Sequence, residues 1–265
     1  MTRRSFGKII KTLLAAALIL AIIPTTAFAD GETASSVTQL QSEIAQNMTN
    51  RETLFAINYT GDASQLQNIS NVVNQAAQSS DYLDLSWSKI NYNITPNTGG
   101  SNGASVNLTI QYYTTKAQEE YVDQKVDQLV PTIINSGMTD FQKEKAIHDW
   151  IINHVSYDST LQQRTAYTAL TSGKTVCAGY AMLMEKMLTK AGIKCIIVTG
   201  SIPEGSHAWN MVQIDGNWYQ VDATNDAGFA NTYRRYNKTN DFLIQHNYVW
   251  DQSAYPTADT TYQAS

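Results

Sequence analysis

The sequence is poor in cysteine, proline and histidine: its 265 residues include two cysteines, five prolines and four histidines. Because proline and glycine are sparse and no segment is of low complexity, ordered structure is expected throughout the mature chain. The four histidines do not cluster with acidic residues, which argues against a metal site. No internal repeat is present, and no cofactor is predicted.

Positive charge is also scarce. The formal net charge is -5, and removal of the four positive charges of the N-terminal segment (Arg3, Arg4, Lys8 and Lys11) would bring it to -9. An acidic chain repels nucleic acid and anionic lipid. The sequence has no basic run, no GxGxxG, and no GxxxxGK followed by Ser or Thr. Nucleic acid is therefore excluded as a partner, and the oligomeric state is left open.

The first 29 residues have the three parts of an export signal. A basic stretch (1–11) precedes an apolar run, "TLLAAALILAII", and then "PTTAFA", which ends in small residues at Ala27 and Ala29. This pattern predicts a signal peptide over 1–29, a mature chain that begins near Asp30, and a secreted or extracellular protein that can associate with the cell surface. A retained membrane anchor is the alternative, although the run is short for the ~20 residues of a bilayer span. "TRRSFGK" also resembles a twin-arginine signal, so the export route stays open between that and the general secretory pathway.

Residues 30–137 are predicted to form a small α+β domain of unknown role. Helical spacing and two-residue alternation predict, in order, a helix (33–48), a strand (53–60), a helix (63–79), two strands (83–95 and 104–115) and a helix (116–135) that Pro131 ends or kinks. The polar positions are mostly Gln, Asn, Ser and Thr, which suggests structure or recognition rather than chemistry.

Residues 138–265 are predicted to form a second domain. Thr139 and Gln142 make a capping box at the start of a helix, and "TAYTALTSG" reads as a short helix or turn. A further helix is expected to begin at Cys177 and to stop at Gly192. A continuous apolar strand, 194–202, precedes two strands joined by Asp-Gly, a strong hairpin signal. The aromatic-rich tail is expected to pack against the body of the domain.

The hairpin brings a histidine and a carboxylate together. A two-residue turn at Asp215-Gly216 would pair Trp209 with Asp222 and His207 with Thr224. His207 and Asp222 then become diagonal neighbours on one face, with Cβ atoms roughly 7 Å apart, within reach of a side-chain hydrogen bond. The opposite face is predicted to be a core face, formed by Ala208, Val212, Ile214, Tyr219, Val221 and Ala223.

Cys177 and Cys195 have different surroundings. A thiol at a helix N-terminus and near an imidazole loses its proton readily, and a carboxylate on the far ring nitrogen fixes the tautomer. The N–H of Cys177 also points to where an oxyanion would form on an attacked carbonyl. Cys195 lies within an apolar strand and is typical of a small core residue. A disulfide between the two is the alternative.

The stretches "SGKTVCAGYAMLMEKMLTKAGIKCIIVTG" and "HAWNMVQIDGNWYQVDAT" resemble the transglutaminase-like core superfamily, which includes transglutaminases and papain-related cysteine enzymes. The upstream "EKAIHDWIINHVSYD" is similar to the helix that precedes the cysteine in bacterial members. The resemblance covers roughly 138–226, with "TNDFLIQHNYVWD" similar to the tail. It implies an α+β, papain/transglutaminase-like core in which the cysteine helix packs on an antiparallel sheet.

The resemblance also implies a mechanism. Cys177 would be the nucleophile, His207 the base and acid, and Asp222 the residue that orients the imidazole. The reaction would be acyl transfer through a thioester on protein or peptide amides, giving a cross-link with an amine and hydrolysis with water. Substrate or oxyanion candidates are Trp209, Tyr157 and Tyr167, of which Trp209 covers the imidazole or simply packs. The alternative function is a non-catalytic, cell-surface binding module on the same scaffold.

Some residues depart from this pattern or stand outside it. Asn225 occupies a position at which members often have Trp, and no calcium loop of the D-x-[DN]-x-[DN]-G type is visible. Asp226 is the fallback acid. His148 is expected to pack its helix, while His154 and His246 are expected to be structural or exposed.

Overall fold

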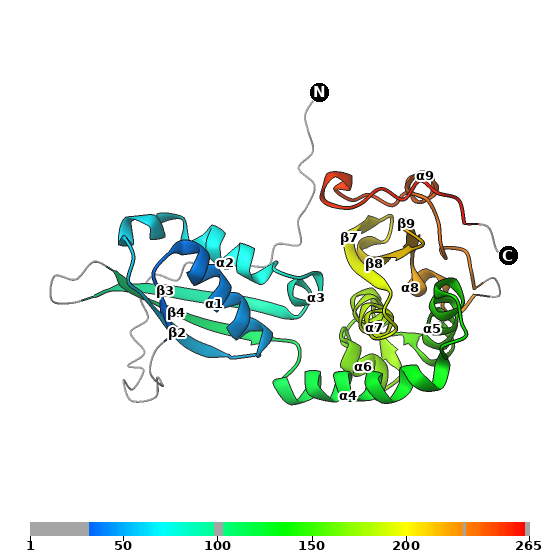
Figure 1. Ribbon diagram of the computed structural model, residues 1–265, viewed down its shortest axis with the longest axis horizontal. Coiled ribbons are helices and arrows are strands. Elements are labelled where there is room, and N and C mark those ends of the chain that lie inside the picture. The colour runs from blue at the N-terminus through cyan, green and yellow to red at the C-terminus, as the bar shows by residue number, and fades with distance from the viewer. Residues whose placement is uncertain (1–31, 98–102, 230–231, 263–265) are drawn as a thin grey trace, which may run out of the picture. The chain divides into compact units, whose positions relative to one another are not determined.

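The computed structural model describes residues 32–97, 103–229 and 232–262. The chain divides into two units, 1–116 and 117–265, which are described separately (Figure 1). The predicted signal peptide, 1–29, lies outside the described residues.

The first unit is a four-stranded sheet covered by helices. Its strands lie in the order β1-β2-β4-β3, and β1 is parallel to β2 whereas the other neighbours are antiparallel. The strands are β1 (Glu32–Ala34), β2 (Leu54–Tyr59), β3 (Trp87–Pro96) and β4 (Ala104–Tyr112). The helices are α1 (Val37–Thr49), α2 (Ile69–Ala77) and α3 (Asp81–Asp84), with a short 3₁₀ helix at Ala63–Asn68.

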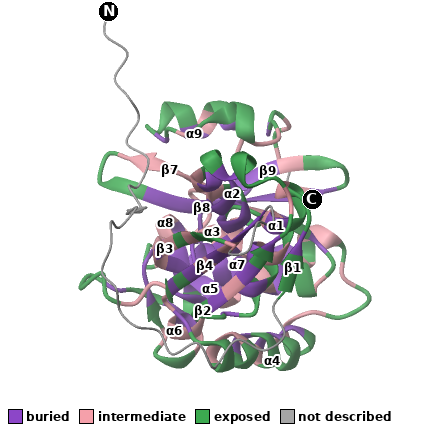
Figure 2. Cartoon of the chain, turned by 90° about the vertical axis from the view of Figure 1, so that its left-hand side faces the viewer, coloured by how far each residue is buried: buried purple, intermediate pink, exposed green. Residues whose placement is uncertain are grey.

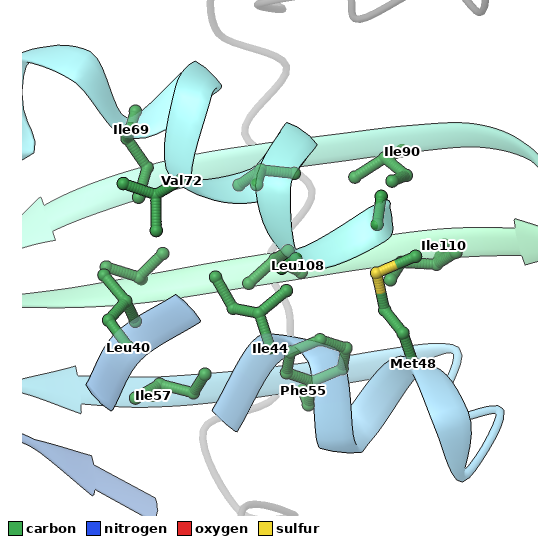
Figure 3. Close-up of a cluster of buried hydrophobic side chains, with 14 of the residues drawn as sticks. Leu40, Ile44, Met48, Phe55, Ile57, Ile69, Val72, Ile90, Leu108 and Ile110 are labelled. Carbon is green, nitrogen blue, oxygen red and sulfur yellow. The ribbon is translucent and has the colours of Figure 1, made fainter. Parts of the chain in front are cut away.

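The core of this unit follows from the spacing of its apolar residues. Leu40, Ile44 and Met48 stand four residues apart on α1, so they share one face, and each is fully buried. They meet the inward-facing residues of the sheet, among them Ile57 and Leu108 (Figure 3). Full burial of such a side chain contributes roughly 1.5–3 kcal/mol relative to exposure. The unit therefore has a hydrophobic core of its own.

The predicted succession of elements is observed here with two differences. The strand β1 adds an edge that the sequence pattern did not indicate. The predicted strand 83–95 begins later, at Trp87, because Ser80 caps a short helix by accepting a hydrogen bond from the Leu83 N–H at 3.1 Å.

The boundary between the units falls after Lys116 and not after residue 137 as predicted. Helix α4 (Lys116–Ile133) belongs to the second unit because charged side chains along it pair with the cysteine-bearing helix. Lys186 binds Asp123 at 2.6 Å and Lys190 binds Asp127 at 2.5 Å. Pro131 lies inside α4, which ends two residues later.

The second unit packs helices against a three-stranded antiparallel sheet in the order β7-β8-β9. This confirms the predicted α+β core, and Figure 2 shows that much of β8 is buried whereas α4 and α9 expose much of their surface. After α4 come α5 (Asp140–His154), β5 (Ser156–Tyr157), α6 (Ala166–Thr171), β6 (Lys174–Thr175), α7 (Cys177–Lys190), β7 (Lys194–Ile202), β8 (Gly205–Ile214), β9 (Asn217–Val221), α8 (Ala223–Asp226) and α9 (Asn240–Gln245).

Several local signals act as predicted. The Thr139–Gln142 capping box forms at the start of α5. Asp215 and Gly216 both have positive φ, 51° and 82°, the conformation of a type I′ turn that suits a hairpin. Gly192, at φ 81°, follows α7 in the left-handed conformation that ends many helices.

Among the described residues, no helix combines the length and the apolar character needed to cross a bilayer.

Candidate active site

The thiol of Cys177 stands at the first residue of α7. Val176 precedes the helix and provides no side-chain cap for the N–H groups of the first turn, of which that of Gly179 donates to the Val176 carbonyl at 2.9 Å. A Cβ atom at Gly179 would collide with Thr175 Oγ1 and lie 2.8 Å from the Thr165 carbonyl oxygen. Only glycine permits this close approach of α7 to the loop before it. The cysteine is thus held at the positive end of a helix.

The strand β8 brings His207 to the same place. Asn210 Nδ2 donates to the Ala181 carbonyl of α7 at 3.1 Å, which fixes the strand against the cysteine helix. The ladder with β9 runs as predicted up to Asn210↔Val221.

The predicted pairs of Trp209 with Asp222 and of His207 with Thr224 do not form. β9 ends at Val221 because the Asp222 side chain caps α8, accepting the Asn225 N–H at 3.1 Å. In the described chain, neither Trp209 nor His207 has a ladder partner on β9. Both pair on the other side of β8, with Val198 and Gly200 of β7. His207 and Asp222 meet through their side chains all the same.

Three side chains meet at the site, and two of them are joined by a hydrogen bond. His207 Nε2 lies 2.7 Å from Asp222 Oδ2, and both residues are buried. This contact leaves Nδ1 as the ring nitrogen available to a thiol. His207 and the backbone N–H of Ala208 lie near enough to Cys177 to lower the pKa of its thiol. The predicted catalytic residues Cys177, His207 and Asp222 are therefore brought together.

The electrostatics of the site favour a charged pair. Burial alone would raise the pKa of the Cys177 thiol, but the hydrogen bond and charge of His207 outweigh burial and bring that pKa below its ordinary value. Burial lowers the pKa of His207, whereas the charge and hydrogen bond of Asp222 raise it well above its ordinary value. The arrangement can hold a thiolate beside an imidazolium, which is a nucleophile with a proton donor next to it.

Asp222 has two further partners. Asn225 Nδ2 donates to Asp222 Oδ2 at 2.7 Å, and the Tyr248 hydroxyl donates to the same oxygen at 2.6 Å. Burial raises the pKa of Asp222, but His207, Tyr248 and Asn225 together hold it at about 2. Sequence reasoning noted Asn225 only as a departure from the family pattern. It missed the role of Tyr248, which lies 26 residues beyond Asp222 in the stretch that is similar to the family's tail.

The other predicted site residues lie in different surroundings. The Trp209 ring stacks on His207 with centroids 5.9 Å apart, and its N–H donates to Gln220 at 2.7 Å, so that proton is already in use. Tyr157 is half-exposed and close enough to Cys177 for its pKa to be raised by burial and by the thiol's charge. The Tyr167 ring lies edge-on to Tyr121 of α4 at 5.5 Å.

Cys195 is a buried residue of β7. Its sulfur accepts a hydrogen bond from Asn210 Nδ2 at 3.4 Å. Both cysteines are free thiols, so the alternative of a disulfide between them is not observed. Within the parts of the chain that the structure describes, no three His, Cys, Asp or Glu side chains group as a metal site would require.

A second buried polar cluster lies beside the first. His148 Nε2 lies 3.2 Å from Asp226 Oδ2, and both side chains are completely buried. His148 thus packs its helix as predicted, and the fallback acid Asp226 pairs with His148 instead of His207. His154 and His246 are exposed, each 2.7 Å from a carbonyl oxygen of its own helix.

Glu144 completes this cluster. Its Oε2 accepts the Tyr236 hydroxyl at 2.6 Å and Asn237 Nδ2 at 2.7 Å, while Oε1 is buried without a hydrogen-bond partner. Burial raises the pKa of Glu144 to about 7 despite these donors.

This raised pKa predicts a pH-dependent stability. Because folded Glu144 binds its proton more tightly than the unfolded chain does, its contribution to the free energy of unfolding is complete below about pH 4.5 and is lost as the pH rises through about 7. The free energy of unfolding lost in this way should be about 3 kcal/mol. His148 and His207, whose pKa values are also raised, add a slope of the same sign in any variant. Urea unfolding at pH 4.5, 6 and 8 should therefore show a loss about 3 kcal/mol larger in the native chain than in Glu144→Gln, and equal losses would contradict the assignment.

The comparisons show which family model and which proteins this chain is similar to. Residues 127–223 match the family model of the transglutaminase-like superfamily, which confirms the predicted resemblance. Human kyphoscoliosis peptidase is 34% identical over an alignment of 125 residues, and the match covers 40% of this chain and 19% of that protein. Mouse kyphoscoliosis peptidase is 32% identical over an alignment of 134 residues, and the match covers 44% of this chain and 20% of that protein. The matched part is therefore only about a fifth of the length of these relatives.

A solved structure described as a TGase is 15% identical and has a TM-score of 0.35, and the alignment covers 86% of this chain and 64% of that one.

Proposed function

Because residues 127–223 carry a transglutaminase-like domain, we propose that the protein is a cysteine-dependent acyl-transfer enzyme acting on protein or peptide amides. The observation that carries the proposal is the position of Cys177 at the start of α7 beside the hydrogen-bonded His207–Asp222 pair, where His207 lowers the pKa of the thiol. A lowered thiol pKa beside a cationic imidazole is what a cysteine nucleophile requires.

In the first step, the Cys177 thiolate attacks the amide carbonyl carbon and the carbonyl oxygen becomes an oxyanion. The N–H of Cys177, at the positive end of α7, would stabilise this negative charge. The His207 imidazolium gives its proton to the leaving nitrogen, so the C–N bond breaks and a thioester remains. Asp222 holds the imidazole by its Nε2–H throughout.

In the second step, a nucleophile attacks the thioester. His207 removes its proton, and the thiolate leaves and is regenerated. An amine as nucleophile gives a new amide and hence a cross-link, whereas water gives a carboxylic acid. Transferase and hydrolase reactions use the same three residues to form the thioester and differ only in the second nucleophile. The proposal therefore includes both reactions.

We further propose that this chemistry takes place outside the cytoplasm of a bacterium. The support is the basic, apolar and small-residue succession over 1–29, which is typical of an export signal. The substrates would then be secreted or cell-surface proteins and peptides, including those associated with the cell wall.

The test combines labelling with turnover. Iodoacetamide at pH 6 should label Cys177 rapidly and leave the buried Cys195 untouched. A glutamine-containing protein with a fluorescent amine should then show incorporation if the enzyme is a transferase, and release of peptide or ammonia if it is a hydrolase. Cys177→Ala should abolish either activity and Cys195→Ala should not. Equal, slow labelling of both cysteines would instead favour a non-catalytic binding module.

A further inference from the structure

One oxygen of Asp222 is surrounded by donors from three separate parts of the chain. Oδ2 lies 2.7 Å from His207 Nε2 on β8, 2.7 Å from Asn225 Nδ2 on α8, and 2.6 Å from the hydroxyl of Tyr248 beyond α9. Asn225 Nδ2 also donates to that hydroxyl at 2.8 Å. Tyr248 and Asp222 are both almost completely buried. The hydrogen bond between Tyr248 and Asp222 therefore lies in the interior of the protein.

The backbone around Tyr248 is fixed to the sheet that carries His207. Val249 and Ser201 of β7 exchange two backbone hydrogen bonds, each of 2.9 Å. Gly200 makes this possible, since a Cβ there would collide with the Val249 carbonyl oxygen. Farther along, the Tyr255 hydroxyl accepts the Thr199 N–H at 3.2 Å. The segment that carries Tyr248 is therefore paired with β9 before it, where Lys238 lies opposite Gln220, and with β7 after it, at Val249.

We infer that Tyr248 is a positioning residue: its hydroxyl fixes Asp222 against His207, so the C-terminal segment 236–262 completes the site built by α7 and β8. This inference rests on the proposed function, because it concerns the same three residues. Tyr248 acts through Asp222 and contacts neither the thiol nor the reacting bond.

The ring and the hydroxyl of Tyr248 have separate tasks. The ring packs edge-on against Trp209 at 5.2 Å and against His207 at 5.9 Å. The hydroxyl alone reaches the carboxylate. Tyr248→Phe keeps the ring packing and removes only the donor, which separates positioning from core packing.

The direction of the effect follows from the charges around Asp222. The groups that face it are His207 on β8, Cys177 on α7, Asp226 on α8, Tyr248 from the C-terminal segment, and Arg235, which directly precedes that segment. A donated hydrogen bond stabilises the ionised carboxylate, so its loss raises the pKa of Asp222. The bare carboxylate also repels the thiolate more strongly. Because of both changes, the Cys177 thiolate becomes protonated at a higher pH as the solution is acidified.

The experiment measures the rate of Cys177 alkylation by iodoacetamide from pH 3 to 8. Tyr248→Phe should move the acid limb of this profile upward by about one pH unit, the size expected for one hydrogen bond to a charged group. The matched control is Tyr236→Phe. Its hydroxyl also donates to a buried carboxylate at 2.6 Å, but to Glu144 in the neighbouring cluster. The control should lose stability in urea and keep the native acid limb.

The outcomes separate the two proposals. An unchanged acid limb in Tyr248→Phe, or an equal shift in Tyr236→Phe, overturns the positioning role and leaves the proposed function standing. A native Cys177 that reacts no faster than Cys195 overturns both. An upward shift in Tyr248→Phe alone supports the role of the C-terminal segment.

Discussion

Replacing His207 by alanine should lower the rate of Cys177 alkylation at pH 6 on the order of a hundredfold. Without the imidazole, burial is the main influence on the thiol, and its pKa rises above the ordinary value of about 8.5. Less than about one molecule in a hundred then carries a thiolate at pH 6. The thiolate that does form is more basic and a better nucleophile, which offsets part of the loss.

The pH profile distinguishes this cause from a general disturbance. In His207→Ala the rate should rise about tenfold per pH unit from pH 6 to 8, whereas the native rate should be nearly flat there. Cys195 in the same sample reports on any loosening of the fold, since it is buried in β7. A flat profile in the variant, or labelling of Cys195 that rises with it, would count against the thiolate–imidazolium pair.

Replacing His148 by alanine should lower the free energy of unfolding by roughly 3–5 kcal/mol, the usual cost of removing one partner of a buried ion pair. The side chains of His148 and Asp226 are both inaccessible to solvent. The variant would leave Asp226 with the Arg235 N–H at 2.8 Å as its remaining hydrogen-bond donor in the described structure. It would also open a cavity next to Tyr236, whose ring lies 4.8 Å from the imidazole.

His154→Ala is the matched control, because His154 stands on the same helix but is exposed. It should change stability by less than about 0.5 kcal/mol. Urea unfolding of the two variants at pH 7 makes the comparison, and circular dichroism checks that each retains its helices. If the two variants were equally stable, the His148–Asp226 pair would not be a support of the fold.

Local sequence signals predicted much of the second unit because they act over a few residues. Asp-Gly sets a hairpin turn by its own backbone preference, and once the turn is fixed the register as far as Val221 follows by counting. The same count failed at Asp222, since it assumed that the strand continues. A side chain that can cap a helix competes with the ladder at this point, and the cap forms.

The partners of Asp222 could not be predicted in this way. Tyr248 reaches the carboxylate from 26 residues away, and the similarity of its stretch to the family's tail does not indicate the pairing of Val249 with Ser201 that places it. The Glu144 cluster is similar, since Tyr236 and Asn237 lie more than ninety residues from it. Contacts of this kind depend on how the tail crosses the sheet, and hydrophobic periodicity carries no information about that crossing. Helix α4 was assigned to the wrong unit for a related reason: its ion pairs with α7 are long-range.

The place of Tyr248 in the chain has a consequence for synthesis. The ribosome makes Cys177, His207 and Asp222 well before it reaches residue 248. A nascent chain that has not yet emerged as far as Val249 can form the helix and the hairpin but lacks the hydroxyl that holds the carboxylate. On the positioning role inferred for Tyr248, the thiol therefore acquires its full reactivity late, after the residues that carry the chemistry have folded. This order limits the time in which an active thiol is exposed on an unfinished chain.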